Sequence, residues 1–358
     1  MISPFLQEGF KPHVEWFSRG DLVIDAGTTH TVLASRQNGF LLRCPTRVAL
    51  NEERSGKGGK GEVRLSMAAY GSGALRWDDS WPETVRMVSP MDHGQVAERA
   101  AMDMLLRAMY RQVRGGQPPL WQGRGLGGLL VDPGQNMEQQ YLLFELTQPL
   151  AGGTVKPLSI PLAAARGAGW EIQAPRGRMV IDLGGGRTTL GVISMGQLVH
   201  HHSRPVGGED LDRALAAYIE SAYHIPVELS FAERVKKEIG SLYPQEKPLQ
   251  TVLQGSPGPG GQGKKFLLDD NEVRDALLDA FEPVVGAIQQ GFSGLDPEIC
   301  RDISTDGVML VGGGALLAGT AQYLSERFGL PFYLSADPLN ILVKGAMALL
   351  NESSGKES

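Results

Sequence analysis

The sequence lacks long apolar runs, and it has few cysteines. None of its hydrophobic stretches reaches the roughly 20 residues of a membrane-spanning helix. Its first residues lack the basic segment and the small-residue cleavage site of a secretory signal. The two cysteines, Cys44 and Cys300, lie far apart and match no metal-ligand spacing. We therefore expect a cytoplasmic protein whose cysteines are reduced packing residues.

A surplus of positive charge is also absent. Lys and Arg number 34 against 40 Asp and Glu, which gives a formal net charge of −6. This balance argues against a general nucleic-acid surface, so we expect no direct nucleic-acid partner. The chain does contain ample core material, because 42% of its 358 residues are hydrophobic. That is enough for two domains of ordinary size.

Two stretches of the chain repeat one order of residue types: an apolar strand, an aspartate, a glycine turn, hydroxyl residues and a second apolar strand. They are DLVIDAGTTHTVLAS at 21–35 and VIDLGGGRTTLGVIS at 180–194. One such turn is most often a plain β-hairpin, although its bare backbone N–H groups can approach an anion closely. The repeat, with a third glycine turn in VMLVGGGALLAG at 308–319, predicts a duplicated α/β fold that closes on one nucleotide.

Hydrophobic periodicity predicts the elements around these turns. The first hairpin is expected to continue as a β-meander through 39–42 toward 45–50, and later strands are expected in GGLLVDP and near Leu158. Helices are expected over 98–114, from Met137, over 161–169, after Gly207-Gly208, over FAERVKKEIGSLYP and after the third glycine turn. Stretches rich in glycine at 55–62 and 255–265 are expected to be loops.

The chain resembles the MreB-type bacterial actin homologues of the actin/Hsp70/sugar-kinase superfamily. The resemblance rests on DAGTTHT, DLGGGRTT, RPVGGEDLD, AERVKKEIGSLYP, VGGGALLAG and ADPLN, and it is poorest between about Arg111 and Leu158. It implies an actin-like duplicated ATPase fold, α/β in class, with a nucleotide cleft between two domains. The implied divisions are an N-terminal extension at 1–20, domain I at 21–158 with an insert lobe at about 50–90, domain II at 159–335 with a small lobe at about 207–275, and a C-terminal segment at 336–358 that returns to domain I.

The resemblance also implies ATP and Mg²⁺ as cofactors and assigns residues to them. Asp25 and Asp182 would hold Mg²⁺ through water molecules, as suits an ion that keeps much of its hydration shell. The implied phosphate contacts are Gly27, Thr28, Thr29, Gly184, Gly185, Gly186 and Thr188. Ribose and adenine would be contacted by Glu233, Lys236 and Lys237, and the cleft floor would be formed by Gly312, Gly313 and Gly314. Without the flanking motifs, Glu233, Lys236 and Lys237 would be expected only to form a solvent-exposed face of their helix.

Two positions depart from the family pattern. In LSIPLAAARGAG, Ile160 occupies the position where relatives carry a glutamate that positions the attacking water, and Ser159 comes just before it. Because isoleucine can neither accept a proton nor orient water, we expect ATP binding with weak hydrolysis. Arg187 replaces a small hydroxyl residue, and it either contacts a phosphate or points to solvent. A metal site at 200–202, three consecutive histidines, is disfavoured because alternate residues of a strand point to opposite faces.

The resemblance implies a filament-forming, ATP-binding protein of the bacterial cytoskeleton, with cell-shape determination as its role. Its partners would be further copies of itself and, if hydrolysis is weak, an active paralogue. A MamK-like organelle-aligning or plasmid-segregating filament is the alternative. A sugar or acetate kinase would need a catalytic aspartate motif in the cleft, and a chaperone-type ATPase would need a peptide-binding domain after the nucleotide domain. We find neither in the sequence, so both are less favoured.

The N-terminal stretch leaves membrane contact open. Its apolar stripe is formed by Ile2, Phe5, Leu6, Phe10, Val14 and Phe17. Pro12 interrupts a helix there, and acidic residues cancel the basic ones, so no cationic attraction to anionic lipid is expected. Packing of this stripe against the body or against a partner is the alternative to peripheral membrane contact.

Overall fold

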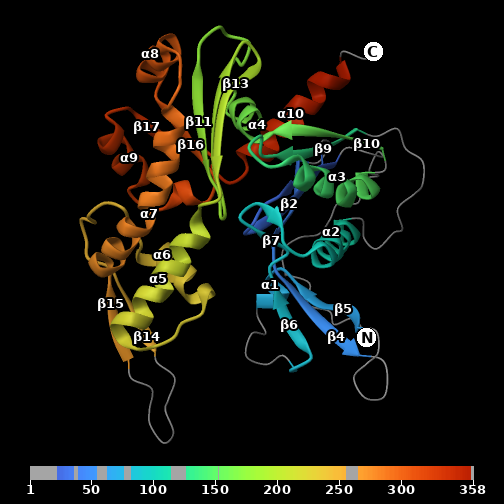
Figure 1. Ribbon diagram of the computed structural model, residues 1–358, viewed down its shortest axis with the longest axis vertical. Helices are drawn as coiled ribbons and strands as arrows, with labels where there is room; N and C mark the ends of the chain where they lie inside the picture. Colours follow the sequence, from blue (N-terminus) through green and yellow to red (C-terminus); the bar gives the residue numbers. More distant parts are fainter. Residues whose placement is uncertain are drawn as a thin grey trace, which may run out of the picture.

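The computed structural model describes residues 22–35, 39–54, 63–75, 82–113, 126–151, 153–254 and 265–355. Two five-stranded sheets form its centre, and both have the same plan (Figure 1). In each sheet three consecutive strands form an antiparallel meander. A later strand pairs parallel with the first strand of the meander, and a further strand pairs parallel with that later strand. The predicted duplicated α/β fold is therefore confirmed.

The first sheet has the order β10-β9-β1-β2-β3, and the second has the order β13-β12-β11-β16-β17. The strands of the first are β1 (Leu22–Ala26), β2 (His30–Ser35), β3 (Gly39–Pro45), β9 (Leu126–Val131) and β10 (Thr154–Ser159). Those of the second are β11 (Arg178–Leu183), β12 (Thr188–Ser194), β13 (Gln197–Arg204), β16 (Val308–Val311) and β17 (Phe332–Leu334). Central strands such as β16 are buried on both faces, which explains their unbroken apolar sequences.

Helices cover both sheets, and two of them lie between the sheets. The first sheet is packed by α2 (Arg99–Val113) and α3 (Met137–Ala151). The second is packed by α5 (Gly208–Tyr223), α6 (Leu229–Ile239), α7 (Asp270–Phe292), α8 (Pro297–Asp306) and α9 (Thr320–Phe328). Between them, α4 (Ile160–Gly167) and α10 (Ile341–Gly355) share one apolar core with strands of both sheets. This shared core joins the two halves of the molecule.

Two smaller sheets extend toward one end of the molecule (Figure 1). One has the order β5-β4-β6 and is followed along the chain by a short β-hairpin; the other is a two-stranded ribbon. Their elements are β4 (Val48–Arg54), β5 (Val63–Tyr70), α1 (Ser72–Leu75), β6 (Val85–Val88), the hairpin of β7 (Met91–Asp92) and β8 (Gln95–Val96), and the ribbon of β14 (Gln250–Gln254) and β15 (Lys265–Asp269). No helix within the described ranges is long and apolar enough to cross a membrane.

The expected helices at 98–114, from Met137, over 161–169, after Gly207-Gly208 and ending at Gly240 are all present as α2 to α6. Two expectations differ from the structure. The meander does not continue into 48–50, because β4 belongs to another sheet. The chain leaves the first sheet after Pro45, which has no N–H to donate, and the N–H of Thr46 donates to the Thr29 carbonyl. After the third glycine turn the chain forms only a 3₁₀ turn, η1 (Gly314–Leu316), before α9 begins.

Several expectations lie outside the described residues: the 1–20 extension with its apolar stripe, the loop at 55–62, and 255–264 of the second loop. The domain divisions stay a prediction. Within the described chain, α10 packs on α4, β9 and β1.

Candidate functional site

A cavity of about 630 Å³ lies between the two halves, and both contribute residues to its lining. This volume is typical of a small-molecule site. Of the residues assigned from sequence, the lining contains Asp25, Gly27, Thr28, Thr29, Asp182, Gly184, Gly185, Gly186, Glu233, Lys236, Lys237, Gly312, Gly313 and Gly314. Residues more than 280 positions apart in the chain are thereby brought to one site.

The two Asp-Gly-Thr turns meet across this cavity. A Cβ atom placed on Gly185 would lie 1.8 Å from Thr29 Oγ1, and one on Gly186 would lie 2.6 Å from Thr28 Oγ1. No side chain larger than hydrogen fits at either glycine. Both turns therefore line one part of the cavity, and glycine N–H groups and threonine hydroxyls are donors suited to oxyanions.

Thr188 does not line the cavity. Its hydroxyl donates to the Val206 carbonyl at 2.9 Å, and its side chain is buried. The next residue, Thr189, lines the cavity instead. Adjacent residues of β12 point to opposite faces, so only one of the two threonines can face the ligand site.

Asp25 and Asp182 lie at corresponding positions, near the ends of β1 and β11. Burial raises the pKa of Asp25 to about 6, although the positive charge of Arg43 opposes the shift. Burial raises the pKa of Asp182 to about 7, and the negative charges of Asp25 and Asp132 add to the shift. Acids that repel one another in this way are stabilised by a cation. Carboxylate oxygens are ligands that Mg²⁺ prefers, and one or two of them suit an ion that keeps several water molecules. Within the described chain, no group of three or more His, Cys, Asp or Glu residues could hold a metal ion by itself.

Asp132 also lines the cavity, and the sequence analysis missed it. It follows the apolar strand β9, as Asp25 and Asp182 conclude apolar runs, so the stretch LLVD carries a signal that could have identified it. Its Oδ2 atom accepts hydrogen bonds from Arg187 Nε at 2.5 Å and Ser203 Oγ at 2.6 Å. Its Oδ1 atom accepts one from the Gly134 N–H at 2.8 Å. Both oxygens of the carboxylate therefore accept hydrogen bonds from the protein.

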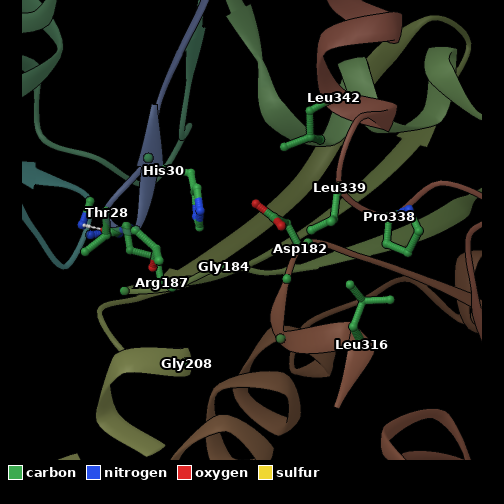
Figure 2. Close-up of a pocket in the computed structure, with 18 of the residues that line it drawn as sticks. Thr28, His30, Asp182, Gly184, Arg187, Gly208, Leu316, Pro338, Leu339 and Leu342 are labelled. Carbon is green, nitrogen blue, oxygen red and sulfur yellow. Dashed lines mark hydrogen bonds between the residues drawn. The ribbon is translucent and has the colours of Figure 1, made fainter. Parts of the chain in front are cut away.

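The far end of the cavity is more apolar. Figure 2 shows Thr28 and Arg187 on one side, Leu316, Pro338 and Leu339 on the other, and Asp182 between them. The three charged residues of α6 assigned from sequence also line the cavity. Lys237 Nζ lies 2.6 Å from Glu233 Oε1, so these two share a helix face, whereas Lys236 Nζ pairs with buried Asp212 at 2.7 Å and donates to the Gly208 carbonyl at 2.7 Å. Lys236 thus also fixes the start of α5.

His30 and Arg43 line the cavity as well and were missed from sequence. Arg43 Nη2 donates to the Leu339 carbonyl across the cavity. Burial, together with the nearby positive charges of Arg43 and Lys237, lowers the pKa of His30 to about 4. The imidazole is therefore neutral at pH 7. His30 directly follows Thr29 in DAGTTHT, so the first turn carries a signal that could have identified it. Arg43 follows no such motif and reaches the site through the pairing of β2 with β3.

The sequence pattern of the MreB/Mbl protein family matches residues 19–357. The chain belongs to the MreB/Mbl family. The cell shape-determining protein MreB of Escherichia coli strain K12 is 31% identical over 325 residues, which cover 91% of each chain. MreB5 of Spiroplasma citri bound to AMPPNP has a TM-score of 0.83 at 27% identity, over 95% of this chain and 98% of that one. MamK in its double helical filament has a TM-score of 0.71 at 16% identity, over 92% and 98%, and so shares the fold.

Membership of the MreB/Mbl family and the actin-like fold confirm the resemblance seen in the sequence. Ile160 and Arg187, the two positions expected to depart from the family pattern, both line the cavity. Ile160, the first residue of α4, lines the cavity and presents only carbon atoms to it. The Ser159 hydroxyl is buried, has no hydrogen-bond partner among the described residues and does not belong to the lining.

Arg187 is the second departure from the MreB/Mbl pattern. Of the two expectations for it, a solvent-directed side chain is wrong, because Arg187 lines the cavity, whereas contact with a phosphate stays a prediction. Its guanidinium pairs with Asp132, and only 13% of the Arg187 side chain is exposed. It also donates to Ser203 Oγ at 2.9 Å and to the His93 carbonyl at 3.2 Å.

Proposed function

We propose that this MreB/Mbl-family chain binds ATP with Mg²⁺ in the cavity between its halves and assembles into linear filaments that serve cell shape. The observation that carries the proposal is the meeting of the two turns, with Gly185 and Gly186 against Thr29 and Thr28. Two glycine turns and two opposed carboxylates form one site for a polyphosphate and its cation. AMPPNP bound to MreB5 of Spiroplasma citri supports the nucleotide class.

The residues divide the cavity into two parts. Asp25 and Asp182 would hold the hydrated cation, and the turns at 27–29 and 184–186 would hold the phosphates. Glu233, Lys237 and the glycines 312–314 would receive the adenosine, beside Leu316 and Leu339. When bound, Mg²⁺ offsets the charge of the phosphates. Titration with a fluorescent ATP analogue in the presence of Mg²⁺ tests this: saturable, Mg²⁺-dependent binding is expected, and its absence contradicts the proposal.

Hydrolysis would be slow in this chain. Water attack on the terminal phosphate needs an acceptor for a proton or a group that orients the water, and Ile160 supplies neither. Asp132 does not take over this role, since its oxygens accept from Arg187, Ser203 and Gly134. A sugar or acetate kinase would need a further aspartate as its base, whereas Asp25 and Asp182 are assigned to the cation and Asp132 pairs with Arg187.

Self-assembly follows from the family and from the named behaviour of a structural neighbour, the MamK double helical filament. We place the protein in the cytoplasm, with further copies of itself as its partner. A slowly hydrolysing subunit would give persistent filaments or would co-assemble with an active paralogue. A MamK-like role is less favoured than cell shape, because the curated relatives at 31% identity are cell shape-determining proteins.

A further inference from the structure

One ion pair crosses between the two halves at the phosphate end of the cavity. Arg187 directly follows the second glycine turn, whereas Asp132 ends β9 of the first sheet. Their side chains are 13% and 6% exposed, and both residues line the cavity. The β7–β8 hairpin closes over them, since the His93 carbonyl accepts from Arg187 and a Cβ atom on Gly94 would lie 2.2 Å from Arg187 Cδ. The guanidinium is therefore held in one place.

The hydrogen bonds of Arg187 leave part of its guanidinium available. Its Nε–H is used by Asp132, one N–H of Nη2 by Ser203 and one N–H of Nη1 by the His93 carbonyl. A guanidinium has five N–H donors. Two of them, one on each terminal nitrogen, have no partner among the described residues. A forked pair of free donors on a fixed cation is well suited to a phosphate group.

The charges at this end of the cavity also call for a cation. Asp25, Asp132 and Asp182 all line the cavity. A terminal phosphate entering here would add its own negative charge to that of three carboxylates, and one divalent ion does not offset this total. Arg187 supplies one further positive charge. Figure 2 shows it beside Thr28 and Gly184, the two turns assigned to the phosphates.

We propose that Arg187 is a specificity-determining residue that contacts the terminal phosphate and so favours a nucleoside triphosphate over a diphosphate, with Asp132 as its positioning residue. This inference rests on the proposed function. It assigns the terminal-phosphate contact to a side chain that the family pattern does not supply. Asp132 keeps the guanidinium at the phosphate end when the cavity is empty, so the contact needs no rearrangement.

The test compares the affinities of ATP analogue and ADP, each with Mg²⁺, in the full chain. Arg187→Thr is expected to weaken binding of non-hydrolysable ATP analogue by on the order of tenfold, as for a lost charged hydrogen bond. ADP affinity should stay within about twofold, because ADP lacks the group that Arg187 contacts. Arg187→Lys keeps the charge beside Asp132 but not the fork, and it should lose part of the preference. Asp132→Asn should lower the preference, with no further loss when combined with Arg187→Thr.

Arg47 provides the matched control. Its Nη2 atom lies 2.9 Å from Glu209 Oε1, which also joins the two halves, but Arg47 does not line the cavity. Arg47→Thr should therefore leave the ratio of the two affinities unchanged. Equal losses for ATP analogue and ADP in Arg187→Thr, or an unchanged ratio, would show that the Arg187 pair only ties the halves together. A wild-type chain that binds neither nucleotide overturns the proposed function as well.

Discussion

At the scale of single residues, a group that a ligand needs can lower the stability of the protein without that ligand, and Asp182 is the clearest case. Its folded-state pKa of about 7 exceeds the ordinary value of 3.8, so the folded protein retains a proton that the unfolded chain has released between these values. The stability from this group is fully present below about pH 4 and is lost as the pH rises through about 7. In the absence of ligand, ionised Asp182 therefore destabilises the protein at pH 8.

Asp182→Asn removes this charge and keeps the shape of the side chain. We expect the variant without nucleotide to gain about 1–3 kcal/mol in free energy of unfolding at pH 8 and nothing at pH 4, since only the charged form is costly. The same variant should lose binding of the Mg²⁺–ATP analogue. Urea denaturation at the two pH values and a binding titration measure both effects. Parallel stability profiles for wild type and variant would contradict the pKa assignment.

At Ile160 we expect a substitution to raise activity rather than to lower it. Ile160→Glu restores a carboxylate at the start of α4, facing the cavity. We expect steady-state phosphate release to rise by on the order of tenfold or more, because a positioned general base typically contributes about 10²–10⁴ in rate. Ile160→Leu, equally apolar, is the control and should change nothing. A brisk wild-type rate that Ile160→Glu leaves unaffected would refute slow hydrolysis.

At the scale of elements, the packing of α4 against α10 holds the two halves together. A Cβ atom on Gly345 of α10 would lie 1.7 Å from the Ala163 carbonyl oxygen of α4, so the helices touch backbone to backbone. Gly345→Ala should lower the free energy of unfolding by about 1–3 kcal/mol, the usual cost of overpacking. Gly286 of α7 has no heavy atom within 4 Å of such a Cβ, and Gly286→Ala should instead stabilise by up to about 1 kcal/mol. Urea denaturation compares the pair, and a Gly345→Ala variant as stable as wild type would contradict this contact.

Elements set by local pattern could be predicted from the sequence, whereas those set by long-range pairing could not. The hairpins around Asp25 and Asp182 follow a short order of apolar, acidic and glycine residues, and helices such as α2 follow their periodicity. Arg187 and Asp132 are 55 residues apart, and only the meeting of the two sheets makes them partners. The choice between Thr188 and Thr189 depended on the register of β12, which the sequence alone leaves open.

On the scale of the whole molecule, nucleotide binding would depend on both halves. A bound nucleotide would therefore influence how the two halves are positioned relative to each other. Residues of both sheets line one cavity, and α4 and α10 connect the sheets through a common core. A bound nucleotide would add contacts to both sides at once. Assembly that depends on this arrangement should therefore respond to the nucleotide, and with Ile160 in place the ATP-bound filaments should persist.

Sedimentation of the full chain with Mg²⁺ and ATP, compared with ADP and with no nucleotide, tests the central claim most directly. We expect micromolar wild-type protein to pellet with ATP as filaments visible by electron microscopy, and to pellet much less with ADP or without nucleotide. Asp182→Asn, folded but unable to hold Mg²⁺–ATP, should stay in the supernatant throughout. Wild-type protein that remains in the supernatant with ATP across a range of salt concentrations, or that pellets equally in all three conditions, would contradict the account.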